Sequence, residues 1–368
     1  MIMKKAQNFQ HFKTMKLPPC VSFLTMKKIV RYLLISLLLI SCADDIVIKD
    51  CPENVFKAFW NSMNEHYVNF DEKRVDWDSV YQTYYPEVQE MKCDTDLIPV
   101  FQKIIDSLKD KHISIAINKT NYIQVLETDT SNIMLVNNNN YKFTLIEPYK
   151  LSNGFALYQS RLRDYICIDL IEFFSTFNYE LLTSEIKKLN YSKGIIIDVR
   201  NNHGGFLKFP LEILSWFYKG EKTLFYQSYK LSPAQNDFIT PKPFVYSGKG
   251  IIPDSIPIVL LTNQRTNSAA NFFAYIIHDF PNCISVGLPT GGGDGPVHNE
   301  LLPNGWILQY PYFRNYSLKG VHFERKLVPD YSIVNTDPMM YDDQYIKALC
   351  LLDSINKYPY TDYKKIWD

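Results

Sequence analysis

The segment that decides the fold is Gly194–Gly205, which reads GIIIDVRNNHGG. It begins with a nearly continuous run of Ile and Val and then changes to polar residues that end in paired glycines. A short apolar run of this kind is typical of a strand buried on both faces. Paired glycines allow backbone amides to approach a ligand closely. Taken alone, the loop is also an ordinary glycine-containing turn into a helix.

Outward from this strand, apolar strand-like segments alternate with segments of helical periodicity. The expected strands are 165–170, 194–199 and 257–262, and the expected helices are 179–189, 208–218 and 268–280. Buried strands that alternate with helices indicate an α/β core with a largely parallel, twisted sheet. In such sheets, ligands collect at the loops that leave the carboxyl ends of the strands.

The residues before this core have a different pattern. Apolar residues at a spacing close to 3.6 predict helices within 53–112, which we interpret as an N-terminal helical cap. The core is expected over 113–368, and its first part, 113–164, is expected to be a small β-rich connection. Strand-like segments within or next to it are 113–117, 132–136 and 141–146.

The N-terminus has the features of an export signal. From Met26 a basic start is followed by an apolar stretch that ends in Leu39-Ile40-Ser41-Cys42. The stretch is short for a membrane span and suits a signal peptide. Its end resembles a bacterial lipobox, which implies acylation of Cys42 and anchoring in the bacterial cell envelope, on its periplasmic or cell-surface face. A single transmembrane anchor is the alternative. Residues 1–25 are expected to be a non-native extension, so that the chain starts at Met26.

Composition limits the function classes further. The 39 Lys and Arg residues equal the 39 Asp and Glu residues, so no bulk charge attracts nucleic acid, and no nucleic-acid partner is expected. The five cysteines beyond Cys42 lack a CxxC spacing, which disfavours a zinc site. Isolated buried thiols are favoured, and a single disulfide, such as Cys51 with Cys93, is the alternative. No metal and no cofactor are predicted, and nothing in the sequence specifies an oligomeric state.

A second loop, Asn263–Asn271, follows the expected strand 257–262 and leads into a helix. It places Ser268 at a helix N-terminus, where free N–H groups and the helix dipole favour an attacking alkoxide and an oxyanion. This is the logic of a nucleophile elbow, although the GxSxG pattern is absent. The competing interpretation is that Ser268 only caps the helix.

Together the two loops resemble the tail-specific, or carboxyl-terminal processing, serine peptidases and their relatives in the core of tricorn protease. Segment 198–205 is similar to the family's acidic residue followed by Arg-Asn-Asn-x-Gly-Gly, and 266–271 to its nucleophile elbow. Two further segments, 286–293 and 320–330, are similar to a glycine-rich block and a closing Gly-Val-x-Pro-Asp block. The resemblance covers residues 55–335 and implies a ClpP/crotonase-like core with Ser268 as the nucleophile.

The chain departs from the processing branch of this family at the catalytic base. That branch carries a Lys in the glycine-rich block, and 290–295 contains none. The tricorn-like branch uses a His in an Asp-x-His stretch, which resembles Asp110-Lys111-His112. The resemblance therefore implies His112 as the base and Glu324 as the supporting acid. Lys111 stands where the tricorn arrangement has a Ser.

The oxyanion hole is expected at the amides of Gly204, Gly205 and Ala269, because amides pointing into a pocket stabilise developing negative charge. We therefore expect an envelope-anchored serine endopeptidase that cleaves peptides or exposed protein segments. The interval between His112 and Tyr165 is too short for a PDZ domain with its connections, so none is expected. The main alternative is a catalytically inactive lipoprotein that keeps the fold and binds peptides or proteins. An esterase with the same nucleophile is a weaker alternative.

Overall fold

A computed structural model describes residues 51–125, 146–160, 163–188, 193–234, 236–336, 341–359 and 361. All of them belong to one unit, Asp50–Asp368. Residues 1–42, with the expected signal peptide and Cys42, lie outside the described residues. So do the expected strand 132–136 and nearly all of 141–146. Among the residues described, no helix combines the length and the apolar character that crossing a membrane requires.

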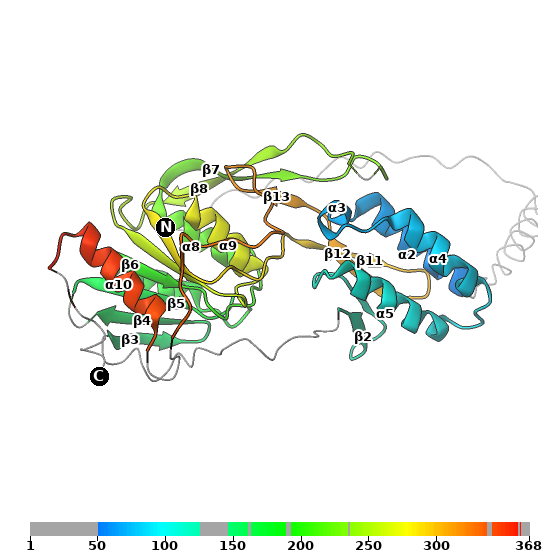
Figure 1. The fold of residues 1–368 in the computed structure, drawn as a ribbon, viewed down its shortest axis with the longest axis horizontal. Helices are drawn as coiled ribbons and strands as arrows, with labels where there is room; N and C mark the ends of the chain where they lie inside the picture. Colours follow the sequence, from blue (N-terminus) through cyan, green and yellow to red (C-terminus); the bar gives the residue numbers. More distant parts are fainter. Residues whose placement is uncertain are drawn as a thin grey trace, which may run out of the picture. The chain divides into compact units, whose positions relative to one another are not determined.

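The strand quoted at the outset, β6, lies in the middle of a seven-stranded sheet (Figure 1). In spatial order the strands are β14 (Tyr331–Ser332), β10 (Cys283–Gly287), β9 (Ile258–Thr262), β6 (Gly194–Asp198), β5 (Tyr165–Leu170), β4 (Phe155–Ser160) and β3 (Ile146–Ser152). Strands β14 to β5 pair in parallel, whereas β4 and β3 pair antiparallel. The sheet is therefore mixed, with the expected parallel strands at its centre.

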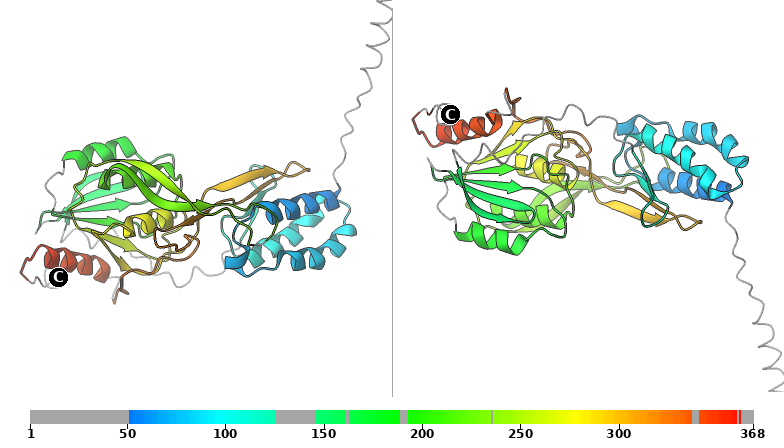
Figure 2. Two further views of the ribbon diagram at one scale, coloured as in Figure 1. Left: turned by 90° about the horizontal axis from the view of Figure 1, so that it is seen from above. Right: turned by 90° about the horizontal axis from the view of Figure 1, so that it is seen from below.

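Both faces of the sheet are covered, which is why the central strands are apolar at nearly every position. Ile195 and Ile197 of β6 face one apolar cluster, and Ile196 between them faces another. The first cluster includes apolar residues of the helices α7 (Tyr179–Lys188), α8 (Lys208–Leu214) and α9 (Ala269–His278) and of the 3-10 helix η2 (Ser215–Phe217). The second includes residues of α10 (Asp343–Ile355). Figure 2 shows α7 and α10 on opposite faces of the sheet.

The N-terminal helices form a third apolar cluster, whose residues are not continuous in sequence. The helices are α2 (Pro52–His66), α3 (Phe70–Lys73), α4 (Trp77–Gln89), η1 (Asp94–Asp96) and α5 (Leu97–Leu108). Their cluster also contains Ile115 and, from much later in the chain, Trp306 and Leu308. Ile115 and Leu308 belong to a four-stranded antiparallel sheet, and Trp306 directly precedes one of its strands. The order of this sheet is β11 (Val297–Leu301), β12 (Ile307–Pro311), β1 (Ser114–Ala116) and β2 (Tyr122–Gln124). The core of the helical region therefore extends past residue 112 and includes a hairpin from the second half of the chain.

A third, three-stranded antiparallel sheet completes the described part of the chain. Its order is β13 (Arg314–Tyr316), β7 (Lys219–Ser228) and β8 (Lys242–Lys249). The long β7–β8 ribbon was not expected from the sequence. Cys51, Cys93, Cys167, Cys283 and Cys350 are all free thiols, as favoured, but the expectation that they are buried is wrong for Cys51 and Cys93, which are exposed.

Candidate active site

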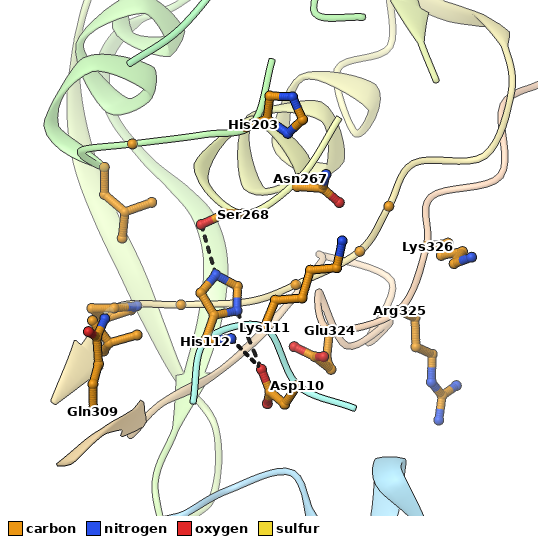
Figure 3. A pocket seen from close by; sticks show the side chains of 18 of the residues that line it. Asp110, Lys111, His112, His203, Asn267, Ser268, Gln309, Glu324, Arg325 and Lys326 are labelled. Carbon is orange, nitrogen blue, oxygen red and sulfur yellow. Dashed lines mark hydrogen bonds and ion pairs between the residues drawn. The ribbon is translucent and has the colours of Figure 1, made fainter. Parts of the chain in front are cut away.

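A pocket of about 940 Å³ lies where the two sequence-predicted loops meet the helical region. The loop after β6 and the loop after β9 contribute one wall. The opposite wall comes from residues 109–112, directly after α5, and from residues 324–326. The glycine-rich segment 291–293 lies between them. Figure 3 shows Ser268, His112 and Asp110 together in this pocket.

Ser268 sits at the junction between β9 and α9 in a strained conformation. Its φ is 54° and its ψ is −125°, a positive-φ combination that L-residues rarely adopt. Its side chain makes no capping hydrogen bond to α9. The interpretation of Ser268 as only an N-cap is therefore not what the structure shows. The backbone turn instead directs the hydroxyl towards the pocket, as in a nucleophile elbow.

The Ser268 hydroxyl lies 2.9 Å from Nε2 of His112. The two residues come from distant segments of the chain. His112 follows the helical region, and Ser268 precedes α9. The distance is within the range for a hydrogen bond between a nucleophile and its base. The structure thus brings together the two side chains that the sequence singled out.

Asp110 lies on the other side of the His112 ring. Its Oδ1 accepts the backbone N–H of His112 at 2.9 Å and lies 3.6 Å from the ring Nδ1. Its Oδ2 accepts hydrogen bonds from the Tyr67 hydroxyl at 2.8 Å and from Asn69 at 3.3 Å. The carboxylate is almost fully buried and is held by partners from the helical region. It is therefore fixed beside the imidazole.

The charges of the pair are mutually stabilising. Burial would raise the pKa of Asp110, but the hydrogen bonds from His112 and the charge of Lys73 lower it below its usual range. Burial would lower the pKa of His112, but Asp110 outweighs this and raises the pKa above the ordinary histidine value. An imidazolium formed at His112 is therefore stabilised mainly by Asp110.

Glu324, expected as the supporting acid, lines the pocket but is bound elsewhere. Its Oε1 pairs with Nζ of Lys73 at 2.5 Å, and its Oε2 accepts the backbone N–H of Asp294 at 3.0 Å. Burial, followed by the nearby charge of Asp110, raises the pKa of Glu324 to about 7. Asp110 rather than Glu324 is therefore the acid next to the His112 ring. Asp110 was quoted in the Asp-x-His stretch, but the sequence did not single it out.

The glycine loop after β6 packs directly against the serine. A Cβ on Gly204 would lie 2.8 Å from the backbone nitrogen of Ala269 and from Cβ of Ser268. The Gly204 amide, however, donates to Oδ1 of Asn202 at 2.8 Å, so it is not available to a ligand as expected. Within the described residues, the amides of Gly205 and Ala269 donate no hydrogen bond. These two amides remain candidates for an oxyanion hole.

The glycine-rich segment leaves the space that the His112 ring occupies next to Ser268. A Cβ on Gly293 would lie 2.7 Å from Cε1 of His112, so any side chain there would displace the ring. The absence of a Lys in this segment and the presence of His112 are therefore sterically linked. Asn271 of α9 holds the segment in place, because it donates to the carbonyl of Gly293 and accepts from Thr290.

A buried ion cluster anchors the loop after β6. The guanidinium of Arg200 is completely buried and pairs with Asp198 and Asp342, each at 2.7 Å. It also donates to Gln344 at 2.9 Å. A buried network of this kind is stable only if each of its charged and polar groups has a hydrogen-bond or ionic partner. The sequence contained Asp198 and Arg200 but gave no signal for Asp342, since that contact joins two distant segments.

Comparison with known proteins finds peptidase families in both the N-terminal and the central parts of the chain. Residues 167–333 match peptidase family S41, and residues 50–106 match the tricorn protease C1 domain. A 97-residue stretch is 30% identical to carboxyl-terminal-processing peptidase 3, chloroplastic, from Arabidopsis thaliana. The match covers 26% of this chain and 17% of that protein, so the chain spans only a small part of this relative.

Solved structures extend the match over most of the chain. A Parabacteroides merdae protein assigned as a peptidase has 26% identity and a TM-score of 0.67, and the match covers 81% of this chain and 93% of that one. Mature CPAF shares the fold at 11% identity with a TM-score of 0.59, over 86% of this chain and 99% of that one. The helical N-terminal region followed by an α/β core with a mixed sheet is the fold that this chain shares with these structures. The family match over residues 167–333, together with these structures, supports peptidase family S41 for this chain.

Proposed function

We propose that the chain is a serine endopeptidase that cleaves peptides or exposed protein segments, with Ser268 as nucleophile and His112 as base. The observation that carries this proposal is the 2.9 Å contact between the Ser268 hydroxyl and Nε2 of His112. Family membership and the strained elbow at Ser268 support it. The steric link between Gly293 and His112 supports a histidine base in place of the Lys of the processing branch.

In the proposed reaction, His112 Nε2 accepts the hydroxyl proton while Ser268 Oγ attacks the carbonyl carbon of the scissile peptide bond. The carbonyl oxygen becomes an oxyanion, which the amides of Gly205 and Ala269 stabilise at the N-terminus of α9. The imidazolium then donates its proton to the leaving amine as the C–N bond breaks. Water, deprotonated by His112, hydrolyses the acyl-enzyme and restores Ser268.

Asp110 is the group that we assign to hold the imidazole in this role. Its contact with Nδ1, together with its hydrogen bond to the His112 backbone, fixes the ring orientation. Asp110 therefore acts as a positioning residue that also stabilises the imidazolium. Glu324 contributes a more distant charge and holds Lys73 and the segment at Asp294.

Peptide hydrolysis tests the proposal. The protein should cleave members of a mixed peptide library, and Ser268→Ala and His112→Ala should each lose activity by at least about 10³-fold. The double variant should be little worse than either single variant, because the pair acts as a unit. Binding of peptides without any cleavage would instead favour the inactive, peptide-binding alternative.

We also propose that Cys42 carries a lipid that anchors the protein in a bacterial cell envelope, as a lipobox-like sequence implies. The mass of the mature N-terminus and the membrane fractionation of Cys42→Ala test this part. A released, soluble variant is the expected result. Complete retention of Cys42→Ala in the membrane would show that the apolar segment is a true span.

A further inference from the structure

The pocket contains more positive than negative side chains, although the whole chain has no net charge. The excess of positive charge is therefore a local feature of this pocket. Its cations are Lys73, Lys109, Lys111, Arg325 and Lys326, and its anions are Glu72, Asp110 and Glu324.

Each of the three anions is already bound to a partner within the protein. Asp110 accepts from Tyr67 and His112, and Glu324 pairs with Lys73, as described above. Glu72 pairs with Arg325 at 2.8 Å. The pocket acids are therefore committed to the protein itself and leave little negative charge for a cationic substrate.

The remaining cations are exposed at the pocket. The side chains of Lys109, Lys111 and Lys326 line it and are accessible to solvent. Within the described residues, Lys109 and Lys326 have no acidic partner. In the view of Figure 3, Lys111 and Lys326 lie on the same side of Ser268, and Gln309 lies on the opposite side.

A different part of the lining is apolar. Phe174 and Phe206, next to the Gly205 loop, are 48% and 55% exposed, high values for aromatic side chains. Leu207 and Val297 complete this apolar lining. An extended peptide across Ser268 would therefore meet apolar surface at one part of the pocket and lysines at another.

Resting on the proposed peptidase function, we infer that the site selects peptides with an acidic side chain on one side of the scissile bond and an apolar side chain on the other. Asp or Glu would lie near Lys109 and Lys326, and the apolar residue near Phe174 and Phe206. A substrate's free terminal carboxylate has the same chemistry as an acidic side chain, so the test separates the two.

The test uses peptides that are acetylated and amidated at their ends and differ only by Glu or Gln at each position flanking the cleaved bond. At one position Glu should give at least about a 5-fold higher kcat/KM than Gln, and the advantage should shrink at high salt. In Lys326→Gln this Glu/Gln ratio should fall by at least about 2-fold. Lys242→Gln, which removes an exposed charge outside the pocket, should leave the ratio unchanged.

The outcomes separate the two proposals. Cleavage with equal rates for Glu and Gln at every position overturns the acidic specificity and leaves the peptidase function standing. The same peptides without the C-terminal amide carry a free terminal carboxylate. If a preference is seen only with these free-acid peptides, the lysines bind the terminal carboxylate, and the inference as stated is overturned. If neither wild-type protein nor any variant cleaves any peptide, the proposed function fails and the inference fails with it.

Discussion

At the scale of single residues, the identity of the acid beside His112 has a measurable consequence in the pH profile. A base must be neutral to accept a proton, so kcat/KM should rise with pH through the pKa of His112. Because Asp110 raises that pKa, the midpoint should lie above about 6.5. Asp110→Asn should move the midpoint to lower pH and reduce kcat by at least about 10²-fold, as loss of orientation predicts.

Glu324→Gln is the matched control for this pH profile. It removes a carboxylate that lines the same pocket but bonds to Lys73 instead of the imidazole. It should therefore shift the midpoint less than Asp110→Asn does. A larger shift with Glu324→Gln would contradict the assignment of Asp110 and support Glu324 as the acid, as the sequence had suggested.

Some of these residues could be identified from the sequence and others could not, for physical reasons. Ser268 and His112 were found because each lies in a recognisable local motif. Asp110 stood two residues before His112, where an Asp side chain commonly accepts the N–H of residue i+2, as it does here. Its contacts with Tyr67 and Asn69 join distant segments, so the sequence could not rank it above Glu324.

At the scale of elements, the loop after β6 can be tested through Gly205. Its φ is +133°, and a Cβ there would collide with the carbonyl oxygen of Phe173. Gly205→Ala should therefore shift the loop, remove a candidate oxyanion donor and lower kcat/KM by at least about 10²-fold. The loop cannot keep its conformation in such a variant, because the added Cβ would overlap the carbonyl oxygen of Phe173.

Gly220→Ala is the control for the change at Gly205. Gly220 also has a positive φ, +79°, but no atom lies within 4 Å of the added Cβ. It should cost about 1 kcal/mol of stability and leave kcat/KM unchanged. Similar kcat/KM values for Gly205→Ala and wild-type protein would remove this loop from the mechanism.

The elements that could be predicted are those whose signal is local. The central strands were identified because burial on both faces makes them almost continuously apolar, and α5 because its apolar residues repeat at helical spacing. The four-stranded sheet was missed, since β1 pairs with β12 nearly two hundred positions later: Ile115 lies opposite Leu308. Such pairings depend on tertiary packing and leave little trace in short segments.

At the scale of the whole molecule, the active site depends on contacts between the helical region and the rest of the chain. His112 follows the helical region, and Ser268 lies between β9 of the larger sheet and α9. Helix α3 joins the two through Lys73 with Glu324 and Glu72 with Arg325, and Asp71 pairs with Arg314. The catalytic pair can form only when these parts are packed together.

Trp306 tests this packing. It is 7% exposed and lies in the apolar cluster of the helices, with its ring 6.2 Å from that of Phe101. Trp306→Ala should lower the free energy of unfolding by about 3–5 kcal/mol, measured by chemical denaturation. Leu301→Ala on the same hairpin removes a side chain that is 72% exposed and should change stability by less than about 0.5 kcal/mol. Equal effects of the two substitutions would show that the hairpin is not part of the helical core.

Reaction with a fluorophosphonate is the most direct measurement of the central claim, that Ser268 is a nucleophile activated by His112. Mass spectrometry of the wild-type protein should find one adduct per chain, located on Ser268. Ser268→Ala should give none, and His112→Ala should react at least about 10²-fold more slowly, because the base that removes the hydroxyl proton is missing. An unlabelled wild-type protein, or His112→Ala labelled at the wild-type rate, would contradict the claim.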